Sequence, residues 1–139
     1  MRKKKINNLK KIKFININRY LKKDSFLKVI NLNFNNKFIV KRFFFIDSRK
    51  SVERGNHAHL KSTQILFCIK GSIKISITDG KNTKTYNLKE STKAIIVPPL
   101  LWSTQKYAKN SILGIFTDTL FNEKDYIRNI EQYLEVINK

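Results

Sequence analysis

Cysteine, proline and glycine are scarce in this sequence, and no long apolar run is present. Cys68 is the only cysteine among 139 residues. An internal disulfide bond is therefore excluded, and we expect the chain in a reducing compartment, the cytoplasm. Polar or charged residues interrupt every apolar stretch behind the basic residues 1–13. We therefore expect neither a secretory signal nor a membrane-spanning helix.

Acidic residues are also scarce. The chain has 10 Asp and Glu against 29 Lys and Arg, which gives a formal net charge of +19. Such a charge suits a nucleic-acid partner. However, the lysines are spread over the whole chain, and neither a zinc-finger spacing nor a base-stacking signature is present. We therefore expect no nucleic-acid partner, and interpret the charge as a background that attracts an anionic nucleotide. Residues 1–13 form a basic arm without an assigned function.

Short alternating apolar runs separated by polar turns predict an all-β fold. In the clearest run, Ile73, Ile75 and Ile77 alternate with polar residues, so one face of this strand should be buried. Pro98 should end the strand before it, because proline cannot donate to a β-ladder. The length suits a single domain over residues 1–139. Further strands are expected at residues 25–32, 38–46, 64–69, 83–88, 93–97 and 111–117.

The apolar period changes near the C-terminus. Apolar side chains recur there at helical spacing, and Asn122 is a suitable N-cap. We expect one amphipathic α-helix over residues 122–138, packed on the sheets. The apolar positions are Tyr126, Ile130, Tyr133, Leu134 and Ile137.

The only two histidines of the chain, His57 and His59, stand two residues apart behind Arg54 and Gly55. Residues i and i+2 of a strand project from the same face, so both imidazoles should enter one cavity. Histidine suits proton transfer near neutral pH because its unperturbed pKa is about 6.5. We interpret the pair as catalytic acid and base. Two polar residues on a sheet face are the simpler alternative.

The spacing around this pair resembles the metal site of the cupins, with two ligands replaced. Cupins have His-x-His, then a Glu, then a Gly, and a last His after a proline-containing motif. Here Gln64 stands in the place of the Glu and Ser103 in that of the last His, while Gly71 and Pro98 keep the frame. A neutral amide and a hydroxyl are poor ligands for a transition metal. We therefore expect no bound metal and no cofactor.

Over residues 42–128 the chain resembles the sugar 3,4-ketoisomerases of the cupin superfamily, which act on dTDP-4-dehydro-6-deoxyglucose. The resemblance implies a jelly-roll homodimer with exchanged N-terminal strands, a dTDP-linked 4-keto-6-deoxy sugar as substrate, and deoxysugar biosynthesis for a surface glycan. The matching pieces are Val40-Lys41-Arg42, Arg54-Gly55-Asn56-His57-Ala58-His59, Gln64, Gly71-Ser72, Asp79-Gly80, residues 98–102 and Asp125-Tyr126-Ile127-Arg128.

Three departures from the family pattern stand out. Leu60 occupies the place of a Lys after the second histidine, and Ser103 that of a His after the tryptophan. A polar contact and a candidate proton donor are therefore missing. Residues 22–27 replace an Asp-x-Arg-Gly-x-Leu segment that lies near the sugar in the family. Both the gluco and the galacto configuration of the product at C4 stay open.

The histidine pair and the resemblance together predict isomerisation through an enediol. The C4 carbonyl acidifies the C3 hydrogen, which a base can remove, and reprotonation at C4 leaves the keto group at C3. We assign His59 as the base and His57 as its partner in proton transfer, with the reverse division as an alternative. Ser103 is a candidate to relay a proton through water.

Seven residues are predicted to bind the substrate. Guanidinium groups bind a diphosphate with two-pronged geometry, and Arg42 and Arg54 are the candidates. A salt bridge at a strand end is the alternative for Arg42. Core packing is the alternative for the aromatic residues at 102 and 126. The predicted set is Arg42, Arg54, Gln64, Trp102, Ser103, Tyr126 and Arg128.

Three other functions remain open. A dTDP-sugar 3,5-epimerase would abstract a proton on the same fold, but it relies on a His-Asp pair and a tyrosine acid in other motifs, which we do not find. A metal-dependent cupin oxygenase conflicts with Gln64 and Ser103. A non-catalytic basic cupin would bind a ligand, or random DNA in a salt-sensitive manner, and would turn over no sugar.

Overall fold

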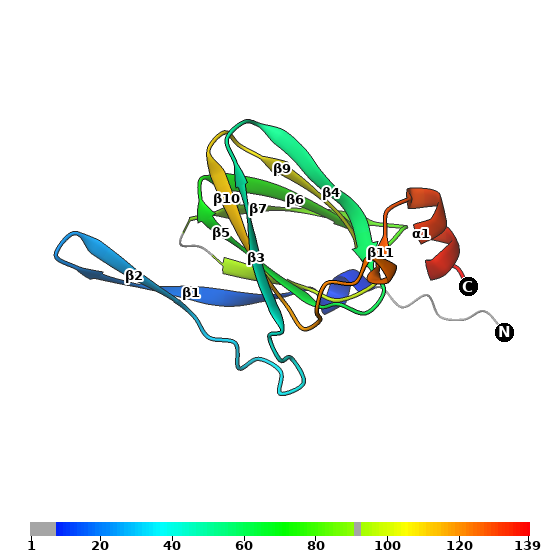
Figure 1. Cartoon of the computed structure of the whole chain (residues 1–139), viewed down its shortest axis with the longest axis horizontal. Helices are drawn as coiled ribbons and strands as arrows, with labels where there is room; N and C mark the ends of the chain where they lie inside the picture. The colour runs from blue at the N-terminus through cyan, green and yellow to red at the C-terminus, as the bar shows by residue number, and fades with distance from the viewer. Residues whose placement is uncertain (1–7, 91–92) are drawn as a thin grey trace.

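Strands and one short α-helix make up most of residues 8–90 and 93–139, which the computed structural model describes (Figure 1). No helix in these two ranges is long and apolar enough to cross a membrane. In chain order the elements are η1 (Asn8–Lys11), β1 (Lys13–Lys22), β2 (Ser25–Ile30), β3 (Arg42–Ser48), β4 (Val52–His59), β5 (Gln64–Lys70), β6 (Ser72–Thr78), β7 (Thr83–Lys89), β8 (Lys93–Val97), β9 (Trp102–Tyr107), β10 (Ser111–Thr117), η2 (Glu123–Asp125), β11 (Tyr126–Ile127) and α1 (Ile130–Ile137).

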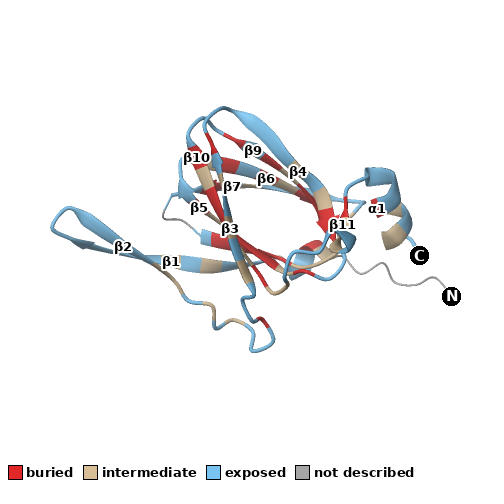
Figure 2. Ribbon diagram, in the orientation of Figure 1, coloured by how far each residue is buried: buried red, intermediate tan, exposed pale blue. Residues whose placement is uncertain are grey.

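The strands form two antiparallel sheets that curl around a shared core. One sheet has the order β2-β1-β8-β5-β10-β3, and the other has the order β11-β4-β9-β6-β7. Ile73, Ile75 and Ile77 are buried between the sheets, where they pack with Leu66 and Leu113. Figure 2 shows the buried residues concentrated on the inner strands, such as β5 and β10. The all-β jelly-roll fold expected from the sequence is confirmed.

The predicted strands fall on observed strands, with differences at their ends. Strand β3 begins at Arg42 rather than at residue 38. Phe38 instead lies in the preceding loop, where it packs with Ile65 and Ile96. Strand β8 ends at Val97, as expected from the proline that follows it.

The α-helix is shorter than predicted, and the prediction of a helix from residue 122 is wrong. Asn122 caps the 3-10 helix η2, where its side chain accepts a hydrogen bond from the Lys124 backbone N–H. Tyr126 then lies in β11, because this segment pairs with the end of β4. Helix α1 begins at Ile130 behind the N-cap Asn129. The spacing of apolar residues is helical from Tyr126 onward, although Tyr126 is in a strand. This is why the helix was predicted to begin too early.

Tyr133 anchors helix α1 to the barrel. Its side chain is fully buried, and its hydroxyl donates to the carbonyl oxygens of Thr78 at 3.0 Å and Leu100 at 2.9 Å. The ring lies against Trp102 at the start of β9. The helix therefore covers one end of the five-stranded sheet, as Figure 1 shows.

The predicted basic arm lies only partly within the described residues. Residues 1–7 lie outside them. Residues 8–11 form η1, where Leu9 is buried in the core between the sheets. Strand β1 begins directly afterwards at Lys13. The inner end of the arm is therefore part of the packed barrel.

Strands β1 and β2 form a hairpin whose outer half projects from the barrel (Figure 1). Residues 13–16 of β1 pair with β8, whereas residues 17–22 pair with β2. Opposite each other in this outer half lie Tyr20 and Leu27, and next to them Leu21 and Phe26. Neighbouring pairs point to opposite faces of a ribbon. Both faces therefore carry large exposed apolar side chains.

Candidate active site

A β-bulge in strand β4 sets the direction of the polar side chains in the barrel. Strand β4 pairs with β9, and the register skips Asn56. On one side of this skip Arg54 lies opposite Gln105, and on the other side His57 lies opposite Ser103. Both β9 partners are buried. The extra residue therefore brings Arg54 and His57 to the same inner wall.

The local sequence favours a bulge at this point. Gly55 and Asn56 have φ angles of 87° and 56°, in the left-handed region that Gly adopts freely and Asn tolerates. A Cβ atom at Gly55 would lie 3.0 Å from the carbonyl oxygen of Ser103. The Asn56 side-chain oxygen accepts a hydrogen bond from the Thr104 hydroxyl at 3.0 Å. The Gly-Asn pair before the histidines therefore has a geometric role.

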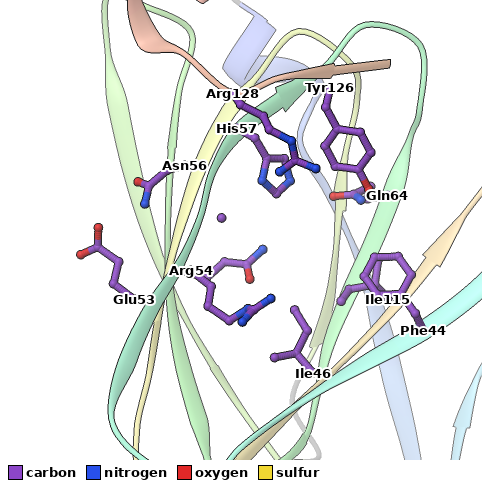
Figure 3. Close-up of a pocket in the computed structure, with 12 residues that line it drawn as sticks. Phe44, Ile46, Glu53, Arg54, Asn56, His57, Gln64, Ile115, Tyr126 and Arg128 are labelled. Carbon is purple, nitrogen blue, oxygen red and sulfur yellow. The ribbon is translucent and has the colours of Figure 1, made fainter. Parts of the chain in front are cut away.

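A cavity of about 390 Å³ opens on this wall, between the two sheets (Figure 3). Its size falls in the range of small-molecule sites. One side is apolar and comes from strands β3 and β10, and the other side is polar and comes largely from β4. The lining residues are Phe44, Ile46, Glu53, Arg54, Gly55, Asn56, His57, Gln64, Gln105, Ile115, Tyr126 and Arg128.

The two histidines lie together, as the spacing predicts. Their ring centroids are 5.0 Å apart with perpendicular planes. His57 lines the cavity, whereas His59 is buried and is not among the described residues that line it. The ring of Tyr126 contacts both, with centroid distances of 5.3 Å to His57 and 4.4 Å to His59. Tyr126 therefore connects the cavity wall with the buried histidine.

His59 is hydrogen-bonded to a carboxylate to which the sequence analysis gave no role. Its Nδ1 atom lies 2.9 Å from Oδ2 of Asp125. These residues are far apart in the sequence, and the pairing of β11 with β4 brings them together. A His-Asp pair is therefore present beside Tyr126, formed by two of the segments that carry the ketoisomerase resemblance. The only signal for Asp125 was its place in the Asp-Tyr-Ile-Arg run of the resemblance.

Burial controls the charge of the histidine pair. Burial and, to a smaller extent, repulsion from His59 together lower the pKa of His57 to about 4. Burial also lowers the pKa of His59, although the hydrogen bond and the charge of Asp125 oppose this effect. Burial acts to raise the pKa of Asp125, but hydrogen bonds from Ser62, His59 and the Lys61 backbone outweigh it, so this pKa is lowered. Near pH 7 both imidazoles are therefore neutral and the carboxylate is ionised.

The hydrogen bonding of the second ring nitrogen of His59, Nε2, differs from that of most buried polar atoms. The Nε2 atom is buried and has no hydrogen-bond partner among residues 8–90 and 93–139. Buried polar atoms nearly always have a partner. A neutral imidazole with an unpartnered nitrogen is suited to accept a proton from a bound molecule.

Two of the three predicted arginines line the cavity. Arg54 extends into it from β4, and Arg128 lies near His57 at its other end (Figure 3). The Arg128 guanidinium lies 4.3 Å from the Tyr126 ring centroid and donates to both carboxylate oxygens of Glu123, at 2.6 and 3.0 Å. The cavity therefore has a cationic group at each end.

Arg42 is not among the described lining residues. Its Nε atom donates to the Thr117 hydroxyl at 3.3 Å, and its guanidinium lies over the rings of Phe44 and Phe121. No ion pair of Arg42 is found in the described part of the chain. The salt-bridge alternative therefore has no support, and the contact with Phe44 places Arg42 beside the apolar wall.

The remaining predicted residues divide between cavity and core. Gln64 lines the cavity, and Tyr126 extends toward it in Figure 3. Ser103 is buried opposite His57. Trp102 packs against Tyr133 of α1, with ring centroids 5.6 Å apart, so core packing describes it better than substrate binding. The described residues contain no group of three or more His, Cys, Asp or Glu that could hold a metal ion.

Sequence reasoning missed most of the cavity wall. The apolar residues Phe44, Ile46 and Ile115 resemble ordinary core positions in the sequence. Gln105 was also missed, although it shares an inward face of β9 with Ser103. Alternation along that strand was the available signal. The Gln105 side-chain oxygen accepts a hydrogen bond from the buried hydroxyl of Tyr107 at 2.6 Å.

Comparison with known proteins shows similarity to sugar 3,4-ketoisomerases. The family model described as FdtA: WxcM-like, C-terminal matches residues 10–138. A curated relative, the TDP-4-oxo-6-deoxy-alpha-D-glucose-3,4-oxoisomerase of Aneurinibacillus thermoaerophilus, is 30% identical over 131 residues, which cover 91% of this chain and 94% of the relative.

Solved structures agree with this similarity. WlaRA, a TDP-fucose-3,4-ketoisomerase from Campylobacter jejuni, is 31% identical with a TM-score of 0.79, and the match covers 91% of this chain and 96% of that one. QdtA, a sugar 3,4-ketoisomerase from Thermoanaerobacterium thermosaccharolyticum in complex with TDP, is 26% identical with a TM-score of 0.83, covering 91% and 94%. The RmlC epimerase of Mycobacterium tuberculosis is similar in fold alone, at 14% identity and a TM-score of 0.71.

Proposed function

Because the chain belongs to the FdtA (WxcM-like, C-terminal) family of sugar 3,4-ketoisomerases, we propose that it converts dTDP-4-keto-6-deoxyglucose into a dTDP-3-keto-6-deoxyhexose. The enzyme class is an isomerase. The epimerase alternative has a weaker basis, since the similar epimerase shares the fold at low identity. The observation that carries the proposal is the wall on which the bulge places Arg54 and His57, next to the buried His59.

The reaction needs a base at C3 and a proton donor at C4. We assign His59 as the base, supported by its neutral imidazole and its unpartnered Nε2. Removal of the C3 proton gives an enediolate with its negative charge on O4. Transfer of the O3 proton to O4 and proton delivery to C4, with formation of the C3 carbonyl, complete the isomerisation. The atoms and electrons balance without an oxidant or a cofactor. His57, whose ring centroid lies 5.0 Å away on the cavity wall, is its partner: it passes to C4 the proton that His59 has taken up, so that both imidazoles return to their neutral form.

The diphosphate needs cationic donors at a distance from the histidines. Arg54 meets this requirement, because it lines the cavity from the far side of the bulge. Arg128 lies near His57, so we assign it to the nucleotide or sugar end of the substrate, where its contacts with Glu123 hold it over Tyr126. Gln64 provides an amide for the sugar hydroxyl groups.

The test is an NMR time course with dTDP-4-keto-6-deoxyglucose in deuterated buffer. The native enzyme should exchange the C3 hydrogen and form a 3-keto product. His59→Asn should do neither beyond background while still binding dTDP, because the amide cannot accept a proton at neutral pH. His57→Asn should retain partial C3 exchange, since its role follows abstraction. Absence of turnover by the native chain, or near-native exchange by His59→Asn, would contradict the proposal.

We also propose a homodimer in which the outer halves of the β1–β2 hairpins are exchanged. A two-stranded ribbon with apolar residues on both faces is unstable when solvated. Light scattering should give a dimer, and Leu21→Lys with Leu27→Lys should give a monomer. Ile130→Lys is the control, because it changes an exposed apolar residue at α1. A native monomer would contradict this proposal.

The cytoplasm is the compartment we propose. Cys68 is buried and free, and burial raises its pKa to about 11. The thiol is therefore protonated and protected from oxidation at neutral pH.

A further inference from the structure

Asp125 is held in a fixed orientation by three hydrogen bonds to its carboxylate. Oδ2 accepts from the Ser62 hydroxyl at 2.5 Å and contacts His59 Nδ1 at 2.9 Å, and Oδ1 accepts from the Lys61 backbone N–H at 2.6 Å. The side chain is 10% exposed. A carboxylate that is bonded on both oxygens and shielded from water cannot rotate without losing several bonds at once.

The surroundings fix this carboxylate further. The Ser62 hydroxyl, which is buried, also contacts the hydroxyl of Thr119. The backbone carbonyl of Asp125 accepts from the Leu60 backbone N–H at 2.8 Å. The loop after β4 and the segment before β11 therefore clamp the aspartate beside the histidine. None of these contacts reaches the cavity directly.

The direction of the His59 bond follows from the chemistry of its partner. An ionised carboxylate can only accept, so the proton of this bond lies on Nδ1, and Nε2 keeps its lone pair. Nε2 is the atom that is buried without a partner among the described residues. We propose that Asp125 is a positioning residue that holds His59 in the tautomer whose Nε2 accepts the C3 proton, and that stabilises the imidazolium which forms. This inference rests on the proposed function.

Asp125→Asn tests the inference with little change in shape. Its amide oxygen can still accept from the Lys61 N–H, while its NH₂ group faces His59 and donates to Nδ1. The proton of His59 then moves to Nε2, which is the nitrogen that must be free. We expect kcat to fall on the order of 10²- to 10⁴-fold, the contribution of a general base. KM and dTDP affinity should stay within about 3-fold of native, because Arg54, which we propose to bind the diphosphate, is unchanged.

A spectroscopic measurement separates this role from a structural one. With only two histidines in the chain, ¹⁵N spectra of the ring nitrogens are simple, and the His57→Asn background assigns His59. The native protein should show protonated Nδ1, and Asp125→Asn should show protonated Nε2. Native kcat in Asp125→Asn, or protonated Nε2 in the native protein, would overturn the inference.

Two further variants complete the test. Asp118→Asn is the matched control, because Asp118 also accepts a backbone N–H of this loop, that of Thr63 at 2.9 Å, without contacting a histidine. It should keep native kcat and the native spectrum. Ser62→Ala removes one hydrogen bond to the Asp125 carboxylate and should lower kcat roughly 2- to 10-fold at unchanged KM. This variant provides the test if Asp125→Asn does not fold. A native chain without turnover would reject the proposed function, whereas an active native chain with native-like Asp125 and Ser62 variants rejects only this inference.

Discussion

Arg54 and His57 line the same cavity although they stand three residues apart on strand β4. In a regular strand their side chains would point to opposite faces, because side chains alternate. The bulge between them adds one residue and removes this conflict. The group proposed to bind phosphate and a group proposed to transfer protons therefore share one wall, and the bulge is a requirement of the site.

The first prediction concerns the glycine of this bulge. Gly55→Ala places a Cβ atom 3.0 Å from the Ser103 carbonyl oxygen on a residue with a φ of 87°. The left-handed conformation alone should cost about 1–2 kcal/mol of stability. The strand must shift to relieve the contact, and a misplacement on the order of 1 Å lowers kcat/KM about 10²-fold. Thermal unfolding and steady-state kinetics measure both effects.

Gly80→Ala is the matched control for this substitution. Gly80 has a φ of 88°, and its Cβ would meet the end of the Ile137 side chain, away from the cavity. It should lose comparable stability and keep its kcat/KM at temperatures where it is folded. Equal kcat/KM in the two alanine variants would show that the bulge does not position the site.

Local patterns explain why much of this fold could be predicted. Strand β6 has a clear period of two, and a proline marks the end of β8, so both were expected where they lie. Helix α1 was placed too early because Tyr126 continues its apolar period. Only the pairing of β11 with β4 decides that this residue is extended. A non-local contact of this kind leaves no mark on the local pattern.

The same distinction between local patterns and non-local contacts applies to the site. The spacing of His57 and His59 predicted their proximity, because both lie on one strand beyond the bulge. Asp125 reaches His59 only through the packing of the C-terminal segment, so spacing could not identify it. Trp102 was assigned to the substrate from its place in a motif, whereas its ring packs against Tyr133. A motif identifies a residue as similar to a family but does not say which way it faces.

The second prediction concerns phosphate binding. Arg54→Gln removes a cation from the cavity and should weaken dTDP binding about 10- to 100-fold, since hydrogen bonds to charged groups contribute roughly 1.5–3 kcal/mol. Arg54→Lys keeps the charge without the fork geometry and should lie in between. Isothermal titration calorimetry measures these affinities. Arg49→Gln, which removes an arginine exposed outside this cavity, should bind like the native protein. Native affinity in Arg54→Gln would place the diphosphate elsewhere.

The third prediction concerns metals. Gln64 and Ser103 stand where cupins carry two metal ligands, and an amide and a hydroxyl are weak substitutes. Purified protein should therefore contain no stoichiometric transition metal, and turnover should survive prolonged dialysis against a chelator. Elemental analysis before and after dialysis, with parallel rate measurements, checks both points. Activity that is lost with the chelator and restored by one divalent metal would support an oxygenase-like site instead.

The last prediction concerns acid stability, and it follows from the buried His57. Its pKa is lowered to about 4 in the folded protein, against the usual value of 6.5. Between these two pH values the unfolded chain binds a proton at this position that the folded chain does not. The free energy of unfolding should therefore rise with pH across this window, by about 3 kcal/mol at most.

His59 should act in the same direction, because its pKa is also lowered. The lowered pKa values of Glu123 and Asp125 also reduce the stability as the pH falls toward their ordinary values of about 4.5 and 3.8, so the comparison with a His57 variant is what isolates His57. Denaturant titrations at pH 4.5 and pH 7, compared between the native protein and His57→Asn, test the effect. The variant lacks the main titrating group and should lose much less stability at pH 4.5. A native protein that is equally stable at both pH values would show that His57 is not buried in its neutral form.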